Sequence, residues 1–287
     1  MGNSIIKVNI KPLLMVGLLL FISGCSAQFT YNNLGWLSSF WIDDYVDLTK
    51  QQNTQFKAIV KKSRDWHRET QLPLYKQDLL ILQKLLQENP QQLQLETQLL
   101  AAKQHWQSLV QQIKDDIAEL ALSLTEAQRR ELVDNIAEKI ANDVDEYNEL
   151  GHGKHLQQRL EKQLDKYQQW LGPLTPEQVA MISVENEQRL ATFQLWQDYK
   201  RNRLAALERL FSNKQMSQAE FKAELNTVMT ERELYMSDAL IAADSKNLSS
   251  YVQLLIALRE SLTAEQLNHA NQEFADLIEQ IDELIAD

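Results

Sequence analysis

The chain has 287 residues, and its 40 acidic residues outnumber its 29 Lys and Arg residues, which gives a net charge of −11. This charge argues against binding to nucleic acid, which requires a basic surface. Only 7 residues are Gly and 5 are Pro, and the abundance of Leu, Gln, Glu, Ala and Lys favours helices. Alternating β-branched runs, which are typical of strands, are missing. We therefore predict an all-α fold and no nucleic-acid partner.

Residues 1–24 are predicted to be a lipoprotein signal peptide. Lys7 and Lys11 precede a mostly apolar run over 13–22, and small residues follow it, as in a secretory signal. The run is shorter than the about 20 apolar residues that span a bilayer. It leads into Ile-Ser-Gly-Cys, with the cysteine at position 25, and this tetrapeptide resembles the bacterial lipobox. The resemblance implies that Cys25 is lipid-modified and becomes the first residue of the mature protein.

Cys25 is the only cysteine, so the mature chain can form no internal disulfide. A thioether-linked lipid would leave no free thiol in an oxidising compartment. Several acyl chains, palmitate among them, hold a protein firmly because each buried methylene contributes about 0.8 kcal/mol. In known lipoproteins an aspartate after the cysteine favours retention in the inner membrane, and Ser26 at this position implies sorting to the outer membrane. We expect a protein that is anchored there and faces the periplasm.

The lipid-anchored segment, 25–47, combines aromatic and acidic residues. Its candidates for a partner-binding site are Trp41, Asp43, Asp44, Tyr45 and Asp47. The alternative is that the aspartates stabilise the positive end of the helix that begins after Thr49. Trp36, Phe40 and Trp41 lie close to the predicted lipid, and tryptophan favours the membrane interface. Of the two interpretations, packing of these aromatic residues against the helices is the one we favour from sequence.

Four short segments carry a resemblance to a known family. They are Tyr31-Asn32-Asn33-Leu34-Gly35-Trp36, Trp41-Ile42-Asp43-Asp44-Tyr45-Val46-Asp47-Leu48-Thr49, Trp66-His67-Arg68 and Leu72-Pro73-Leu74-Tyr75. They are similar to an uncharacterised family of proteobacterial lipoproteins, known only as a domain of unknown function. The similarity is dense over 25–80 and diffuse beyond. It implies a location and a helical fold, and it brings no activity.

Amphipathic periodicity predicts helices through the rest of the chain, which we interpret as one all-helical periplasmic domain, 48–287. Pro73 and Pro90 are expected to bracket a helix over 74–88, because the residue before a proline disfavours the helical conformation. The other helices are expected up to about 122, over 125–151, 154–171, 175–211 and 217–243, from 245 or 249 to 261, and from 263 onwards. The short connections predict antiparallel hairpins in an elongated multi-helix bundle.

The pattern Leu-Thr-x-x-Gln occurs four times, with its threonine at positions 49, 125, 175 and 263, and Met-Ser-x-x-Glu at 216–220 is a variant. In a capping box the N-cap hydroxyl accepts from the N3 amide and the N3 side chain accepts from the N-cap amide, and the N-cap residue contributes about 1 kcal/mol. The motif also resembles the signature of periplasmic stress chaperones and metal-stress sensors of the Spy/CpxP type. Under that resemblance the threonines would contact a client.

No segment points clearly to catalysis. Glu149, His152 and His155 have one Glu-x-x-His spacing, interrupted by glycine, so a polar turn is favoured over a metal site. His67 is expected on the polar face of a helix. We predict no catalytic residue, metal or cofactor. The expected function is a non-catalytic envelope lipoprotein that binds another envelope protein or a client. The alternative is a periplasmic chaperone or stress sensor of the Spy/CpxP type.

Overall fold

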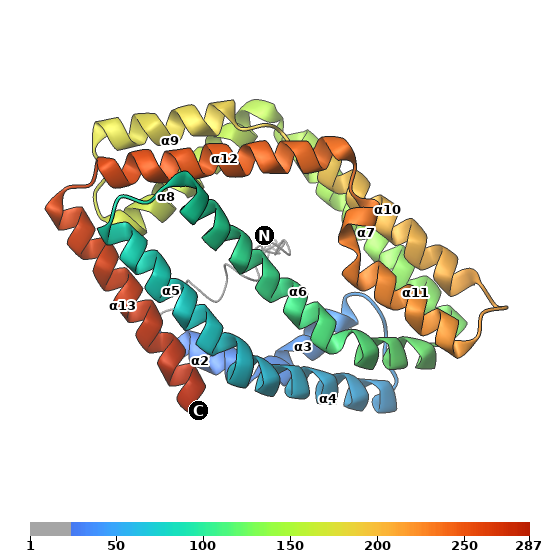
Figure 1. Ribbon diagram of the computed structural model, residues 1–287. Coiled ribbons are helices and arrows are strands. Elements are labelled where there is room, and N and C mark those ends of the chain that lie inside the picture. The colour runs from blue at the N-terminus through green and yellow to red at the C-terminus, as the bar shows by residue number, and fades with distance from the viewer. Residues whose placement is uncertain (1–23) are drawn as a thin grey trace, which may run out of the picture.

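The computed structural model describes residues 24–287, and every regular element in this part of the chain is helical (Figure 1). The α-helices are α2 (Gly24–Asn32), α3 (Leu34–Asp43), α4 (Lys50–Trp66), α5 (Leu72–Gln87), α6 (Gln92–Ser123), α7 (Glu126–Leu150), α8 (His152–Leu171), α9 (Pro176–Gln188), α10 (Phe193–Ser212), α11 (Gln218–Thr230), α12 (Asp238–Glu260) and α13 (Ala264–Ala286). A π-helical turn, η1 (His67–Gln71), joins α4 to α5, and a 3-10 turn, η2 (Arg232–Tyr235), precedes α12. The prediction of an all-α, multi-helix fold is confirmed. The predicted signal peptide lies outside the described residues, apart from Gly24.

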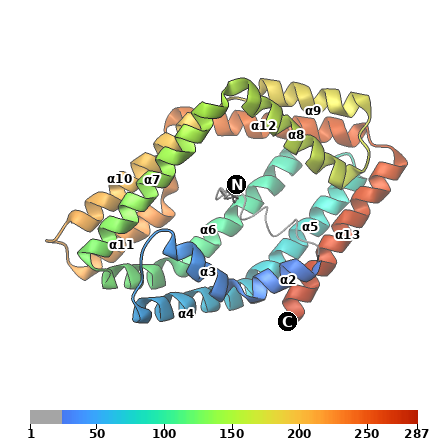
Figure 2. The same cartoon turned by 180° about the vertical axis from the view of Figure 1, so that it is seen from behind.

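The helices are arranged as the sides of an irregular frame around a central opening (Figures 1 and 2). α5 and α13 pack along each other on one side, and α8, α9 and α12 form the next side. α7, α10 and α11 form the third side, and α3 packs on α4 to form the fourth. α6 extends from the α12 side to α4 and α11 and packs against all three. Among the helices of residues 24–287, none combines the length and the hydropathy that a membrane span requires.

The helix caps are those that the repeated motif predicts. Each of the four motif threonines accepts from the amide of the glutamine three residues later, whose side chain accepts from the amide of the threonine. Ser217 and Glu220 form the fifth such box. Gly151 and Gly172, with φ of 74° and 73°, end α7 and α8. Glycine adopts this left-handed conformation without strain, which is why these two ends could be predicted.

The helix does not end at Pro73, and the boundary predicted there is wrong. α4 continues through η1 into α5, where Pro73 is the second residue. A proline lacks the amide hydrogen and its ring clashes with the carbonyl four residues back. The π turn immediately before Pro73, in which the Leu72 amide donates to the His67 carbonyl, widens the helix there. The chain therefore remains helical through a π-bulge.

The prediction of a single helix over 175–211 is also wrong, because this part of the chain forms two helices, α9 and α10. The backbone becomes extended at Arg189, with ψ of 126°. The buried Asn247 of α12 holds this break: its Oδ1 accepts from the Leu190 amide at 2.9 Å and its Nδ2 donates to the Leu190 carbonyl at 3.1 Å. A side chain that is distant in sequence thus supplies the hydrogen bonds that another helical turn would have made.

The boundaries predicted for the next two helices need correction as well. α11 ends at Thr230, and α12 begins after Ser237, whose hydroxyl accepts from the Leu240 amide at 3.2 Å. Ser245 and Ser249, the predicted caps, lie inside α12. Several serines compete for the role of cap here, and residue type alone does not distinguish among them.

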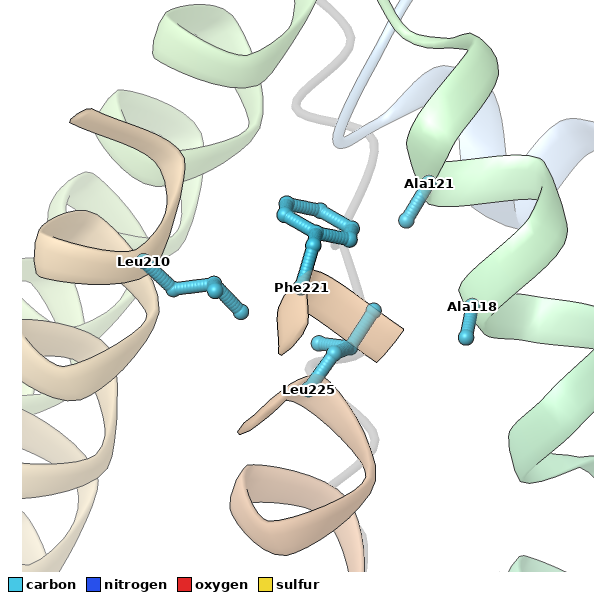
Figure 3. Close-up of a cluster of buried hydrophobic side chains, with 5 residues drawn as sticks. All are labelled: Ala118, Ala121, Leu210, Phe221 and Leu225. Atoms are coloured by element: carbon cyan, nitrogen blue, oxygen red, sulfur yellow. The ribbon is translucent and has the colours of Figure 1, made fainter. Parts of the chain in front are cut away.

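The apolar core is divided into clusters along the frame rather than gathered at one centre. Figure 3 shows one of them, in which Phe221 and Leu225 of α11 lie between Leu210 of α10 and two alanines of α6, Ala118 and Ala121. The alanines are small and three residues apart on one face of α6, so α11 can approach that helix closely. Different parts of the frame are therefore stabilised by separate clusters of buried side chains.

Candidate functional site

The four Leu-Thr-x-x-Gln motifs meet in two pairs. Gln52 and Gln128 form the first glutamine clasp, in which each side-chain amide donates to the other's oxygen, at 3.1 and 2.8 Å. Gln178 and Gln266 form the second glutamine clasp in the same way, at 2.8 and 2.9 Å. The first clasp joins the start of α4 to the start of α7, and the second joins α9 to α13. Sequence analysis identified the caps and did not predict this pairing.

The two clasps share a reciprocal geometry. Each glutamine also donates to the carbonyl that lies two residues before the partner motif's threonine: Ser123, Asp47, Ser261 and Pro173 accept from Gln52, Gln128, Gln178 and Gln266 respectively. All four glutamines are buried. A buried polar network in which every amide has partners fixes the relative position of the helices that carry it. The glutamines of the motif therefore contact other helices rather than solvent.

A second polar network surrounds the π turn, and we name it the π-turn network. It comprises Tyr31 of α2, His67 of η1, Tyr75 and Asp78 of α5, and His105 of α6. His67 Nδ1 lies 3.0 Å from the Tyr31 hydroxyl, and His67 Nε2 lies 3.2 Å from the Tyr75 hydroxyl. The Tyr75 and His105 rings pack edge to face with their centroids 4.4 Å apart. His105 Nε2 lies 2.6 Å from Asp78 Oδ2. The expectation that His67 lies on a polar, solvated face is wrong, because the fold buries it.

One tautomer of His67 satisfies all of the hydrogen-bonding groups around its ring. The Tyr31 hydroxyl is also 3.2 Å from the Arg64 carbonyl, an acceptor only. All groups are satisfied if Tyr31 donates to that carbonyl, His67 Nδ1–H donates to Tyr31, and Tyr75 donates to Nε2. Burial, reinforced by the charge of nearby His105, lowers the pKa of His67 to about 4. Burial also raises the pKa of Tyr75 to about 12 and the pKa of Tyr31 above its usual range. His67 is therefore neutral at neutral pH, and its bond to Tyr31 ties α2 to η1.

Three of the residues singled out after the predicted lipid site, Asp44, Tyr45 and Asp47, are tied to α7. Asp44 Oδ2 lies 3.3 Å from Lys139 Nζ, and that ammonium lies over the Tyr45 ring at 4.2 Å. The Tyr45 carbonyl accepts from Asn135, and the Asp47 carbonyl accepts from Gln128 of the first glutamine clasp. Trp41, Asp43, Asp44 and Asp47 are exposed, and Tyr45 is half-buried. The structure thus brings this segment together with α7 and leaves four of its five candidates accessible. Cys25, the predicted lipid site, lies in α2.

His155, one of the two histidines considered for a metal, is engaged with Tyr147. His155 Nε2 lies 2.7 Å from the Tyr147 carbonyl, and the His155 ring stacks on the Tyr147 ring at 3.9 Å. Tyr147 stacks in turn on Phe193 at 3.8 Å. Within residues 24–287, no three His, Cys, Asp or Glu side chains are grouped so that they could hold a metal ion. The turn around His152 and His155 joins α7 to α8 by aromatic packing.

One concave feature of the described residues is a pocket of about 1300 Å³. Its wall is formed by α5, α6, α8, α12 and α13, and we name it the inner pocket. Apolar side chains dominate the wall, among them Leu86, Leu100, Trp170, Ile241, Leu255 and Phe274. Leu100 and Ile241 remain 46% and 45% exposed, so apolar surface is available to a ligand there. Ligand sites are usually concave and mostly apolar, with a few polar groups that orient the ligand.

Charged residues at the inner pocket have a basic excess, in contrast to the acidic chain as a whole. They are Lys103, Arg159, Lys166, Arg189 and Arg259, against Glu96, Glu233 and Asp244. Three of the arginines are held in place: Arg159 donates to Asn186, Arg189 pairs with Glu185, and Arg259 donates to the Leu86 and Gln87 carbonyls. Burial raises the pKa of Asp244, against the effect of Lys103 and Arg232.

Sequence analysis missed the inner pocket. Its residues come from five helices spread over most of the chain, and their leucine stripes have the period of any buried helix face. Nothing in the periodicity distinguishes a leucine that reaches the pocket from one that is packed.

A frame of paired helices with an apolar pocket and two buried glutamine clasps defines the class of a helical scaffold. The chain belongs to a family of unknown function (DUF6279), whose model matches residues 44–240. The similarity to an uncharacterised domain family that the sequence indicated is thereby confirmed, and the matched region begins inside the segment Trp41–Thr49. Comparison with curated proteins and with solved structures yielded no match.

Proposed function

We propose that this chain is a non-catalytic lipoprotein of the cell envelope, anchored at Cys25 to the outer membrane, facing the periplasm, and that it binds another envelope protein or a client in the inner pocket. The observation that carries the binding proposal is the pocket itself. It exposes aliphatic side chains of α6 and α12 inside a wall fixed by the surrounding helices. Burying such surface favours association by about 25 cal/mol per Å² before the costs of ordering.

The chemistry of the pocket restricts its occupant. Leucine and aromatic walls favour an apolar segment of polypeptide, and the basic excess of the wall favours one flanked by acidic groups. The exposed residues Trp41, Asp43 and Asp47 are a further candidate contact for the same partner, with Asp44 and Tyr45 holding that segment on α7.

In-cell photo-crosslinking tests the binding proposal. A photoreactive residue at Leu100, inside the pocket, is compared with one at Leu80, which is not among the pocket residues. The two leucines are 46% and 47% exposed. They are therefore almost equally accessible, and the comparison isolates the effect of lying inside the pocket. We expect a discrete crosslinked protein from position 100 and none from position 80. Equal crosslinking from both positions would mean that the pocket is not the binding site.

The anchor is tested by Cys25→Ser. We expect this substitution to abolish lipid labelling and to leave the precursor uncleaved at this site. If the substituted protein still fractionates with the outer membrane after a high-salt wash, the lipid is not what holds it there. If the wild-type protein fractionates with the inner membrane, the inference of outer-membrane sorting from Ser26 is overturned, and the inference of a lipid at Cys25 is not.

A second candidate function uses the same pocket. A periplasmic chaperone or stress sensor of the Spy/CpxP type would bind many clients weakly, and an open apolar pocket favours this function too. Suppression of aggregation of several unrelated clients at stoichiometric amounts, lost on Leu100→Glu and kept on Leu80→Glu, would support it. A single crosslinked partner would support the first candidate. Turnover of an envelope substrate that one point substitution abolishes would overturn both.

A further inference from the structure

The segment that follows Cys25 is almost one continuous helix. α2 and α3 are separated only at Asn33, whose amide donates to the Phe29 carbonyl at 3.0 Å, while its own carbonyl accepts from the Leu37 amide at 3.0 Å. Helical spacing therefore relates residues on the two sides of the junction. Tyr31 and Ser38, seven residues apart, are both buried. They mark the stripe that packs on the rest of the molecule.

The opposite stripe is aromatic and exposed. Phe29, Trp36 and Phe40 follow one another by seven and four residues, which places them on one face of a helix. They are 62%, 57% and 56% exposed, and we name them the aromatic face. Trp36 and Phe40 meet edge to face at 4.8 Å, so they form one ordered apolar surface. Cys25 precedes Phe29 by four residues in the sequence. The preference for packing over exposure that we stated from sequence is wrong for Trp36 and Phe40.

Charge is absent from this segment. No Asp, Glu, Lys or Arg occurs from Gly24 to Ile42, although 24% of the whole chain is charged. Charged residues return abruptly at Asp43 and Asp44, where α3 ends. An exposed face of Trp and Phe without charge suits the headgroup level of a bilayer, where aromatic side chains are enriched. A soluble surface would normally carry charge in such a stretch.

We propose that the aromatic face lies in the headgroup region of the membrane to which Cys25 is anchored, as a second attachment beside the lipid. The proposal rests on the proposed lipid at Cys25, which brings the face to the bilayer. We favour a bilayer over another protein chain because the face starts four residues after the anchored position and carries no charge that a partner could pair with. The opposite, buried stripe holds α2 rigidly against the rest of the protein. Tyr31 is bound to His67 and Arg64, and Asn32 to Arg68 and Asp287. The frame is thus held in one orientation on the membrane.

A spin label tests this in the full lipidated protein on phosphatidylcholine vesicles. Cys25 is the only cysteine, and its sulfur carries the lipid, so an introduced cysteine is the one free thiol. Phe40→Cys reports on the aromatic face. Val184→Cys is the matched control, because Val184 of α9 is a hydrophobic residue 50% exposed at a distant place in the frame. Both sites are exposed, so neither substitution should unfold the protein, which the helical circular dichroism of each variant checks.

The readout is the ratio of nitroxide collisions with dissolved oxygen to those with a water-soluble nickel complex. We expect this ratio to be higher at position 40 than at position 184 by roughly threefold or more, since a face at headgroup level meets more oxygen and less nickel. High salt should leave the ratio unchanged because the face has no charge. A label at 40 that matches the label at 184 on vesicles that float with the protein would overturn the proposal and leave the anchor intact. Weak collision with both reagents at 40 would also overturn it, since another chain then covers the face. Protein that does not float overturns both the anchor and the proposal.

Discussion

The second glutamine clasp makes a quantitative prediction about stability. Gln178 is fully buried, and its amide accepts from the Thr175 amide and from Gln266, and donates to Gln266 and to the Ser261 carbonyl. Gln178→Met keeps the length of the side chain and removes all of these bonds. Two part-buried backbone groups, the Thr175 amide and the Ser261 carbonyl, and the buried side-chain amide of Gln266 then lose this partner. Each buried unsatisfied group costs about 1–3 kcal/mol, so we expect the free energy of unfolding to fall by about 3–4 kcal/mol.

Urea unfolding followed by circular dichroism measures this loss. The exposed Gln253 of α12 provides the control, and Gln253→Met should change stability by less than about 0.5 kcal/mol. Gln266→Met should cost about as much as Gln178→Met, and the double variant less than their sum, by about 1–2 kcal/mol, because the amide pair is lost only once. Strictly additive losses, or a Gln178→Met loss no larger than the about 1 kcal/mol of a missing cap, would show that the clasp is not a coupled unit.

Three further predictions follow from the caps, the π-turn network and the pocket. Thr125→Ala should lower stability by about 1 kcal/mol and Thr125→Asp should largely restore it, because aspartate also caps and suits the helix N-terminus; equal losses in urea unfolding would defeat the capping account. Because the pKa of His67 is lowered to about 4 from 6.5, the unfolded chain takes up this proton first. The contribution of neutral His67 to the free energy of unfolding is therefore full above pH 6.5 and is lost as the pH falls towards 4, by about 3 kcal/mol at most. His67→Gln should flatten the dependence of stability on pH in this range. An unchanged dependence would contradict the burial of a neutral imidazole. Leu100→Glu should reduce recovery of the partner roughly tenfold or more in a pull-down, since a charge in an apolar pocket is costly, whereas Leu80→Glu should not; equal effects would point away from the pocket.

The helix caps could be predicted from the sequence, whereas some of the helix breaks could not. The motif threonines, Gly151 and Gly172 act through bonds within one turn, and their helix ends could be predicted. The break at Arg189 could not, because the side chain that holds it, Asn247, lies on another helix. Pro73 was misread for a related reason, since the π turn that accommodates it is bonded to residues of α2 and α5.

The features of the candidate sites that could not be predicted also depend on residues distant in the sequence. Exposure of Trp36 and Phe40 depends on which face of the first helices packs on the frame, and local periodicity gives two faces of similar apolar character. The pairing of the four motif glutamines joins positions 76 or 88 residues apart along the chain. Each glutamine was recognisable as a cap, and its partner was not. The inner pocket needs five helices in place before it exists at all.

The last residue of the chain is bonded to the first described helix, and this has a consequence for the order of assembly. Asp287 Oδ2 accepts from Gln28 at 2.7 Å and from Asn32 at 2.9 Å, and Ile281 and Leu284 share a buried cluster with Tyr31 and Leu72. Contacts of such long sequence separation form late and slowly. A chain that is synthesised from its amino end therefore leaves Tyr31 and Leu72 without these partners until α13 has been made. Until α13 packs on α2 and α5, these two buried side chains are uncovered, and a protease can reach this segment more easily than in the folded protein.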